Sequence, residues 1–310
     1  MSKTIGHAME TQEHIQLCPV CKSPLRHWAE KRNGNDTYTI DRCSECGYAF
    51  VNPRPSMNFL KAHYSNSGHG ATLNPPTLAS IMAAEAEDPN STIDAKRMIA
   101  TIKHLLADQH KMSGRLLDVG SGYGFFSKEA VNNDFKVISL DLAENERNIS
   151  SSVSGIDPIS STFEDLELDH SSMSVVLMSQ ILEHALDVEA WVSKAWQLLE
   201  NEVILAIALP NFGSLQRIIL RENEPYICPP DHLNFFTPEA LTELLRKEGF
   251  VVEKIQHVSR VPKRTIQRRV PEIAAPLALP LWKIVNATMR IIDFMHFGSV
   301  INVYARKVVV

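Results

Sequence analysis

Four of the five cysteines in this 310-residue chain fall into two pairs that share one spacing. Cys18 and Cys21 form the first pair and Cys43 and Cys46 the second, each on a short knuckle-like turn. Two such turns can present four thiolates to one tetrahedral ion, which is a standard ligand set for structural Zn²⁺. Two disulfides or four free thiols are the alternatives, and disulfides are disfavoured because the polar residues 1–17 contain no export signal. The spacing predicts a Zn²⁺ site whose four ligands leave no open position for catalysis.

A second set of chemistry-bearing residues lies in the stretch LLDVGSGYGFF at 116–126. Its first four residues predict a short buried strand, Gly120, Gly122 and Gly124 predict a turn, and apolar residues then recur at helical spacing. A strand, a glycine turn and a helix bring backbone N–H groups and the positive end of a helix to one point, where a nucleotide-like ligand can bind. The dinucleotide fingerprint is not matched, because Phe125 stands where its last glycine would be, and no Gly-Lys-Ser/Thr follows as in a phosphate-binding loop.

Asp118 and the three glycines complete the pattern D/E-x-G-x-G-x-G. This pattern resembles the first motif of the class I S-adenosylmethionine-dependent methyltransferases. The resemblance implies that Asp118 lies near the amino group of the donor's methionine and that the glycines let the backbone approach the nucleoside. The next predicted strand, 135–140, is followed by Asp141, where an acidic residue holds the ribose hydroxyls in Rossmann-type sheets. The resemblance extends this part of the donor site to Leu142.

Two later stretches carry the same resemblance, which covers about residues 115–258 in unbroken order. The stretch STFEDL at 161–166 resembles the family's adenine-contacting turn, which implies that Thr162 and Phe163 contact the adenine. Thr162 replaces the family's customary aspartate. The stretch QILEH at 180–184 resembles the family's Q-x-L-E-H motif, which assigns Gln180 to the donor pocket. The resemblance thus implies S-adenosylmethionine as the cofactor.

His184 and His232 are the candidate catalytic residues. They follow the predicted strands 175–179 and 202–210, so they should reach the carboxyl edge of the sheet, where open α/β sheets bind ligands. Methyl transfer often requires a proton to be removed from the acceptor, and histidine suits this task because its ordinary pKa lies near neutrality. His232 follows a stiff lead-in, Pro229-Pro230-Asp231, and is our preferred base. His184 either closes the adenosine pocket or takes part in catalysis.

The strands and helices expected around these residues indicate an α/β fold, with a sheet that resembles the Rossmann-like sheet of class I methyltransferases. Further strands are expected at 250–257 and 300–307, an amphipathic helix at 92–106, and a helix after Thr237 that Gly249 ends. The domains are predicted as a small zinc ribbon at 1–65, a helical connector at 66–112, and a methyltransferase domain at 113–310. We expect the ribbon and the methyltransferase domain to have separate cores.

A helical insertion is predicted at about 262–298, before the last strand. Its apolar segment, 276–297, follows a basic run and carries one narrow polar stripe, formed by Lys283, Asn286, Arg290 and Asp293. The rest of the predicted helix is broad and apolar. Three roles remain open for it: a lid over the acceptor, a homodimer interface, or peripheral contact with a membrane surface.

Composition argues against several other classes of protein. The net charge is −5, and the segment from Cys18 to Cys46 carries five Lys or Arg against four Asp or Glu, so nucleic acid is not expected as a partner. No apolar run reaches the length that spans a bilayer, which is roughly 20 residues. With no signal peptide either, we expect a cytoplasmic location, with contact at the inner membrane surface as the alternative.

The order of zinc ribbon and methyltransferase domain resembles bacterial enzymes that methylate sugars, glycan precursors and natural products. We therefore expect methyl transfer to oxygen, nitrogen or carbon of a small-molecule acceptor. One alternative is an RNA or protein methyltransferase whose ribbon grips the polymer, which the balanced charge of the ribbon disfavours. The other is a non-catalytic binding module on the same scaffold, which the retained glycines and Asp141 disfavour.

Overall fold

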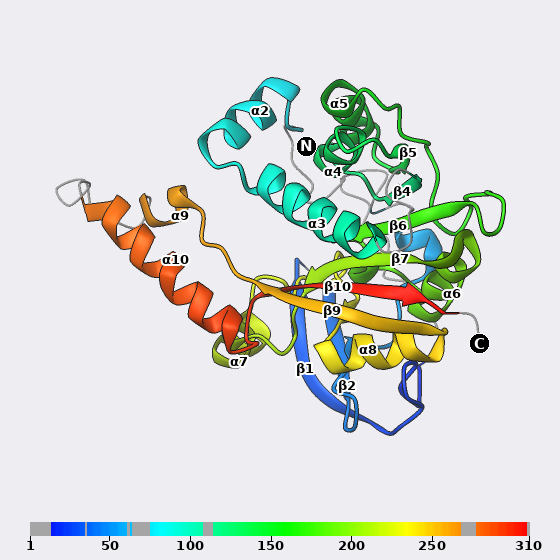
Figure 1. The fold of residues 1–310 in the computed structure, drawn as a ribbon. Coiled ribbons are helices and arrows are strands. Elements are labelled where there is room, and N and C mark those ends of the chain that lie inside the picture. Colours follow the sequence, from blue (N-terminus) through cyan, green and yellow to red (C-terminus); the bar gives the residue numbers. More distant parts are fainter. Residues whose placement is uncertain are drawn as a thin grey trace, which may run out of the picture.

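The computed structural model describes residues 14–34, 36–60, 63, 75–107, 114–267 and 277–308. At its centre lies a six-stranded sheet with the order β5-β4-β6-β7-β10-β9 (Figure 1). Its strands are β4 (Arg115–Val119), β5 (Lys136–Leu140), β6 (Met173–Ser179), β7 (Leu199–Pro210), β9 (Phe250–Val258) and β10 (Val300–Lys307). The strands β4 to β7 pair in parallel, and β10 is antiparallel to both of its neighbours. This topology confirms the predicted Rossmann-like fold class.

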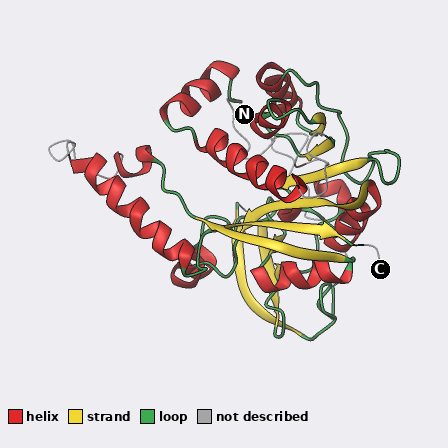
Figure 2. Ribbon diagram, viewed as in Figure 1, coloured by secondary structure: helices red, strands yellow, loops and turns green. Residues whose placement is uncertain are grey.

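Helices cover both faces of the sheet (Figure 2). The helices α3 (Asn90–Ala107), α4 (Phe125–Val131) and α5 (Glu144–Ser154) pack side by side on one face. The helices α6 (Val188–Leu198) and α8 (Pro238–Lys247) pack together on the other. Covered on both faces, the central strands are continuously apolar, and six of the seven residues of β6 are buried.

Helix α8 begins and ends as its sequence predicts. The side chain of Thr237 accepts a hydrogen bond from the backbone N–H of Ala240, and Pro238 occupies the first helical position. Gly249 follows the helix with a φ of +85°, a conformation that glycine adopts without strain. The helix therefore delivers β9 to the edge of the sheet at a fixed point.

The N-terminal part forms a second, antiparallel sheet with the order β1-β2-β3-β8. Its strands are β1 (Leu25–Asn33), β2 (Asp36–Cys43), β3 (Ala49–Val51) and β8 (Asn234–Phe235). The last strand comes from the part of the chain that forms the six-stranded sheet, and the buried cluster that includes Cys18, Cys43 and Tyr48 continues into the residues of β6 and β7. The expectation of separate cores is therefore wrong. A ribbon this small cannot bury enough apolar surface alone, and it completes its sheet and core with the larger domain.

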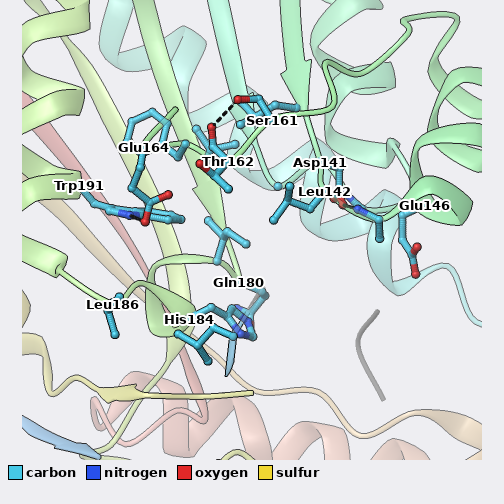
Figure 3. A pocket seen from close by; sticks show the side chains of 18 of the residues that line it. Asp141, Leu142, Glu146, Ser161, Thr162, Glu164, Gln180, His184, Leu186 and Trp191 are labelled. Carbon is cyan, nitrogen blue, oxygen red and sulfur yellow. Dashed lines mark hydrogen bonds between the residues drawn. The ribbon is translucent and has the colours of Figure 1, made fainter. Parts of the chain in front are cut away.

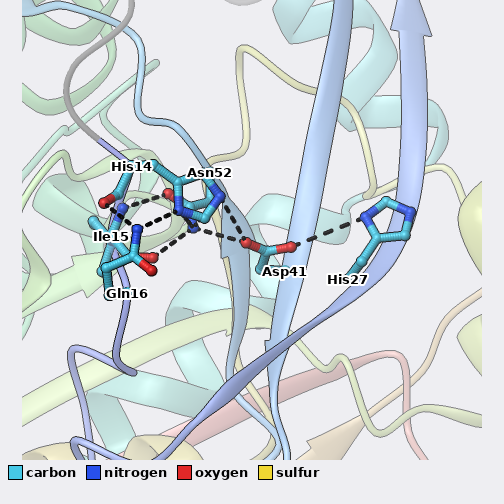
Figure 4. A network of polar contacts seen from close by, with 6 residues as sticks. All are labelled: His14, Ile15, Gln16, His27, Asp41 and Asn52. Atoms are coloured by element: carbon cyan, nitrogen blue, oxygen red, sulfur yellow. Dashed lines mark hydrogen bonds and ion pairs between the residues drawn. The ribbon is translucent and has the colours of Figure 1, made fainter.

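A polar network fastens the start of the described chain to this ribbon (Figure 4). Asp41 is 6% exposed and accepts a hydrogen bond of 2.7 Å from the side chain of Asn52. His14 Nε2 and His27 Nδ1 lie 3.4 Å and 4.0 Å from the two oxygens of the same carboxylate. Asn52 also bonds both backbone groups of Ile15. These contacts hold the residues just before the first cysteine pair against β2.

The remaining helices lie outside the two sheets. In the described ranges they include α2 (Leu78–Glu87), α7 (Leu215–Leu220), α9 (Lys263–Gln267), α10 (Ala278–Phe294) and two short 3-10 helices, η1 (Leu182–His184) and η2 (Arg221–Asn223). Helix α10 extends away from the body of the molecule (Figure 1). Among the described helices, none combines the length and hydrophobicity needed to cross a membrane.

Helix α10 turns part of its polar stripe toward the protein and its apolar face outward. Asn286 donates to the backbone carbonyl of Val261 at 3.2 Å, and Asp293 accepts from the backbone N–H of Ser259 at 3.0 Å. Ile284 and Phe294 are 63% and 85% exposed. The role of this face, whether lid, homodimer interface or membrane contact, stays a prediction.

Candidate active site

A cavity lies at the carboxyl ends of β4, β5 and β6 (Figure 3). Gly120 and Gly122 follow β4, Asp141 and Leu142 follow β5, and Gln180 follows β6; all five line it. In an open α/β sheet, ligands bind in the crevice outside this edge. The structure thus brings together residues from three separate stretches that the sequence assigns to donor binding.

The three glycines of the turn serve different purposes. Gly120 and Gly124 have φ angles of +68° and +79°, and a Cβ atom would lie 2.7 Å from the side chain of Ile181 at the first and 2.9 Å from the backbone of Ser150 at the second. Gly122 has a φ of +51°, but a Cβ there would meet open space. Close packing therefore requires the outer glycines, and the middle glycine leaves the cavity wall open to a ligand. Gly124 itself caps α4 and does not line the cavity.

Asp141 is held in one orientation by two backbone groups. Its Oδ2 accepts from the N–H of Gly122 and its Oδ1 from the N–H of Ala143, both at 2.9 Å. Each carboxylate oxygen can accept a second hydrogen bond. The carboxylate is thus pre-oriented at the cavity wall and fits a pair of neighbouring hydroxyls, such as those of a ribose.

Asp118 lies behind the glycine turn. It is 1% exposed, does not line the cavity, and accepts a hydrogen bond of 2.6 Å from the hydroxyl of Ser127 in α4. Burial raises the pKa of Asp118 to about 6, opposed by the hydrogen bond from Ser127. The predicted contact with the donor's amino group stays a prediction.

The adenine-side residues lie on the cavity wall. Thr162 and Phe163 both line it, and Phe163 packs edge-on against Trp191 with ring centroids 5.2 Å apart. The indole of Trp191 donates to Glu164 at 2.7 Å. Trp191 belongs to α6 and lies outside every motif recognised in the sequence.

Met57 and Leu60, which follow β3, also line the cavity. Sequence reasoning missed both, because isolated apolar residues outside a motif carry no local signal. Helix α10, by contrast, contributes no residue to the lining within the part of the chain that the structure describes. Part of the cavity wall therefore comes from residues 57–60, far before the methyl-donor motifs in the sequence.

Gln180 has an unusual backbone conformation. Its φ is +55°, in the left-handed region that residues other than glycine rarely adopt, and its N–H donates to the carbonyl of Ala208 at 2.7 Å. Such strain is commonest where a side chain must be aimed at a ligand. Figure 3 shows Gln180 beside His184, at the opposite end of the cavity from Ser161 and Thr162.

The structure brings the two candidate catalytic histidines together. His184, in η1, is 8% exposed and lines the cavity; His232 does not line it. Their rings meet edge to face with centroids 4.8 Å apart. The Nδ1 atom of His184 lies 2.6 Å from the carbonyl oxygen of Asp231, and that of His232 lies 2.7 Å from the carbonyl oxygen of Tyr226. Because a carbonyl only accepts, both Nδ1 atoms carry a proton.

Asp231 links this pair to the N-terminal segment. Its carboxylate forms an ion pair of 2.6 Å with Nε2 of His63, while its backbone carbonyl orients His184. The sequence left open whether Asp231 orients its neighbour His232. In these contacts it orients His184 instead.

Glu183, within the stretch QILEH, also lies beside the two histidines. It is 1% exposed, and burial raises its pKa to about 8. Neither carboxylate oxygen has a hydrogen-bond partner on another described residue. One potential ligand atom each from Glu183, His184 and His232 lies within 4.8 Å of the other two. The sequence contains this glutamate within QILEH, but only the fold shows that its carboxylate is buried beside two imidazoles.

The four paired cysteines also converge. The sulfur atoms of Cys18 and Cys46 lie 3.7 Å apart and those of Cys21 and Cys43 3.3 Å apart, and all four fall within 4.8 Å of one another. These separations exceed a disulfide bond of about 2.05 Å and suit four thiolates around one ion. The donor set therefore fits the tetrahedral metal site that the spacing predicts.

Comparison with known proteins gives one family match and one curated relative. A family model described as a methyltransferase domain matches residues 92–255, just over half of the chain. A Mycolicibacterium smegmatis protein named "Probable S-adenosylmethionine-dependent methyltransferase" is 27% identical over 146 residues, which are 46% of this chain and 55% of the relative. The chain thus spans about half the length of that relative.

Two solved structures illustrate the breadth of similar folds. A methyltransferase dependent on S-adenosylmethionine from Archaeoglobus fulgidus is 21% identical, with a TM-score of 0.47, over 67% of this chain and 94% of that one. The 1,6-didemethyltoxoflavin-N1-methyltransferase of Burkholderia thailandensis is 14% identical, with a TM-score of 0.46, over 90% of this chain and 99% of that one. The family model covers more than half of the chain, and the chain therefore belongs to the methyltransferase domain family, with residues 92–255 as its methyltransferase domain.

Proposed function

We propose that this protein transfers the methyl group of S-adenosylmethionine to a small-molecule acceptor. The observation that carries the proposal is one cavity that joins the donor-side residues Asp141 and Phe163 to His184. The donor's sulfonium supplies an activated methyl group when bound. The protein must then hold the acceptor in line with that methyl, exclude water, and remove a proton where the acceptor requires it.

The donor site is built mainly from backbone and from one oriented carboxylate. Asp141 would accept from the ribose hydroxyls, Leu142 and Phe163 would cover the adenine, and the open side of Gly122 would let the nucleoside approach the chain. Leu142 is 46% exposed, which a bound adenine would reduce. The acceptor would lie at the other end of the cavity, beside Gln180 and His184.

The histidine pair supplies the group that takes up the acceptor's proton. His232 is our preferred proton acceptor, because its Nδ1 proton is fixed by a carbonyl and its ring packs against His184. His184 lines the cavity directly and would contact both donor and acceptor.

The contacts between the ribbon and the loop that carries His232 favour a small acceptor over a polymer. Leu233, next to His232, accepts through its carbonyl from the N–H of Val51 and from Arg54, at 3.0 Å and 2.9 Å. Its own N–H donates to the carbonyl of Glu183 at 2.8 Å. The ribbon thereby holds the histidine loop in place, and this structural task accounts for the ribbon without a polymer partner.

We also propose that the four cysteines bind one structural Zn²⁺ ion. The convergence of four sulfurs supports this, and the ion would stabilise the turns that carry β2 and β3. Metal analysis of the purified protein should find one zinc per chain that is lost when the cysteines are replaced.

Donor binding tests the proposed function directly. Isothermal calorimetry on the folded protein should detect binding of both S-adenosylmethionine and S-adenosylhomocysteine. Binding of neither ligand would overturn the proposal. Incubation with metabolite pools, followed by mass detection of methylated products, would then identify the acceptor.

Replacing Asp141 with alanine should weaken donor binding by one to several kcal/mol, on the order of a lost pair of charge-assisted hydrogen bonds. Calorimetry measures the change, and Asp157→Asn is the matched control, because Asp157 bonds Ser151 outside the cavity. Unchanged affinity in Asp141→Ala would place the ribose site elsewhere.

The buried Asp118 should make stability depend on pH. Its folded pKa of about 6 lies above the ordinary value of 3.8, so the folded state holds the proton more tightly. The free energy of unfolding should therefore fall as pH rises from about 4 to about 6, by up to about 3 kcal/mol from this group. Urea unfolding of the wild type and of Asp118→Asn should show a shallower fall in the variant. Identical pH profiles would contradict the assignment.

A further inference from the structure

Three side chains meet where the cavity ends near the acceptor side. Glu183 and His184 are neighbours in η1, and His232 reaches them from the loop before β8. One potential ligand atom of each lies within 4.8 Å of the other two. Two imidazoles and one carboxylate on one side of an ion form a known set for divalent transition metals, and this set leaves coordination positions open.

Glu183 is buried without the partners that a carboxylate needs. At 1% exposure, neither of its oxygens has a hydrogen-bond partner on another described residue. Buried carboxylates in folded proteins are normally hydrogen-bonded, paired with a charge, or bound to a metal. The backbone of Glu183 is fixed, because its carbonyl accepts from the N–H of Leu233 at 2.8 Å and from the side chain of Asn234 at 3.2 Å. The carboxylate of Glu183 is thus held in a buried position without a hydrogen bond from another described residue.

Both imidazoles are oriented as metal-binding histidines usually are. A histidine ligand donates its other ring N–H to a carboxylate, carbonyl or water, which fixes the tautomer and the ring orientation. His184 and His232 donate from Nδ1 to the carbonyls of Asp231 and Tyr226, at 2.6 Å and 2.7 Å. In the neutral rings, the lone pair therefore resides on Nε2 of each.

We propose that Glu183, His184 and His232 bind a divalent transition-metal cation, at a second metal centre distinct from the four cysteines. The ion would compensate the buried carboxylate and would be reached from the cavity along His184, which lines it. The cysteine site offers four thiolates and this one offers nitrogen and oxygen, so the two sites should prefer different metals.

The role of the ion rests on the proposed function, although its binding does not. An ion with open positions would bind an oxygen or nitrogen of the acceptor and hold it near the donor. As a Lewis acid it would lower the pKa of a bound hydroxyl, so that the proton passes to water before the methyl group is transferred. With the ion bound, the two imidazoles would act as its ligands, and the ion would replace His232 in promoting loss of the acceptor's proton.

Titration with Mn²⁺ tests the site. Mn²⁺ suits carboxylate ligands and competes poorly for thiolates, so the cysteine site can stay loaded with zinc. Electron paramagnetic resonance of free Mn²⁺ in the presence of the full-length protein should show one equivalent bound. Glu183→Gln, which keeps the shape of the side chain and removes its charge, should weaken binding at least tenfold, the order of loss seen even for outer-shell changes.

Glu224→Gln is the matched control. Glu224 is also a buried carboxylate, 3% exposed, but it accepts from Gln216 and from the N–H of Tyr226 and lies outside the cluster. Its variant should bind Mn²⁺ like the wild type. Mn²⁺ should also raise the melting temperature of the wild type but not that of Glu183→Gln, which separates loss of the site from loss of the fold.

Two results would overturn the proposal: no Mn²⁺ binding by folded wild-type protein, or equal binding by wild type and Glu183→Gln. Donor calorimetry in the same preparation keeps this test separate from the proposed function. Mn²⁺ binding without donor binding would support the metal site and overturn the proposed methyl transfer. Donor binding without Mn²⁺ binding would support the proposed methyl transfer and overturn the metal site.

Discussion

Replacing His232 with alanine is expected to lower turnover by roughly a hundredfold or more, while the affinity for the methyl donor stays nearly unchanged. His232 does not line the cavity in which the donor would bind, so its removal should leave the donor contacts intact. Its ring is fixed by the carbonyl of Tyr226 at 2.7 Å and packs on His184. A group held this firmly beside the acceptor end can act with little loss of conformational freedom, which proton removal requires.

His184→Ala should behave differently. His184 lines the cavity and is 8% exposed, so its loss should disturb donor binding at least as much as turnover. The measurement is a pair of calorimetric titrations and a pair of rates, made once a methyl acceptor is known. His170→Ala is the control, because His170 is exposed and lies outside the cavity. Full turnover in His232→Ala would assign proton removal to His184, or would mean that the acceptor is already nucleophilic at neutral pH.

The strands of the sheet could be predicted where burial is reflected in a short run of apolar residues. Strand β10 has the predicted bounds, because most of its first six residues are apolar and the strand is buried. Helix α8 was predicted from its cap at Thr237 and its stop at Gly249, both of which are local signals. The sequence missed β1, whose run LRHWAEKRN is largely charged and carries no apolar pattern.

The part of the site that could not be predicted depends on distant pairing. Strand β8 has two residues, and only its pairing with β3 makes it a strand. The same pairing places His232 beside the segment that carries Glu183, more than forty residues earlier in the chain. No local sequence pattern encodes this contact between distant segments. The motif QILEH could therefore be recognised without revealing that its glutamate is buried and lacks a hydrogen bond from another described residue.

Replacing Cys43 with serine is expected to damage both the ribbon and the active site. Cys43 is 1% exposed and belongs to the buried cluster that continues into β6 and β7, so loss of its thiolate would remove one of the four proposed zinc ligands from a shared core. Small zinc-dependent domains draw about 10 kcal/mol or more of apparent folding free energy from their metal. The free energy of unfolding should therefore fall by several kcal/mol even where the rest of the sheet survives.

The effect should reach the catalytic loop through the ribbon strand β3. Val51 and Arg54 hold the carbonyl of Leu233, and Met57 and Leu60 line the donor cavity. A ribbon without its metal should release these contacts, so turnover should fall and donor binding should weaken together. Zinc content, urea unfolding and donor calorimetry measure the three consequences, and hydrogen exchange over residues 226–235 should show faster opening of the loop. Cys228→Ser, which changes a cysteine outside the four-sulfur cluster, should keep its zinc. A Cys43→Ser protein that has lost its zinc but keeps the donor affinity and turnover of the wild type would show that the ribbon and the active site are independent despite their shared core.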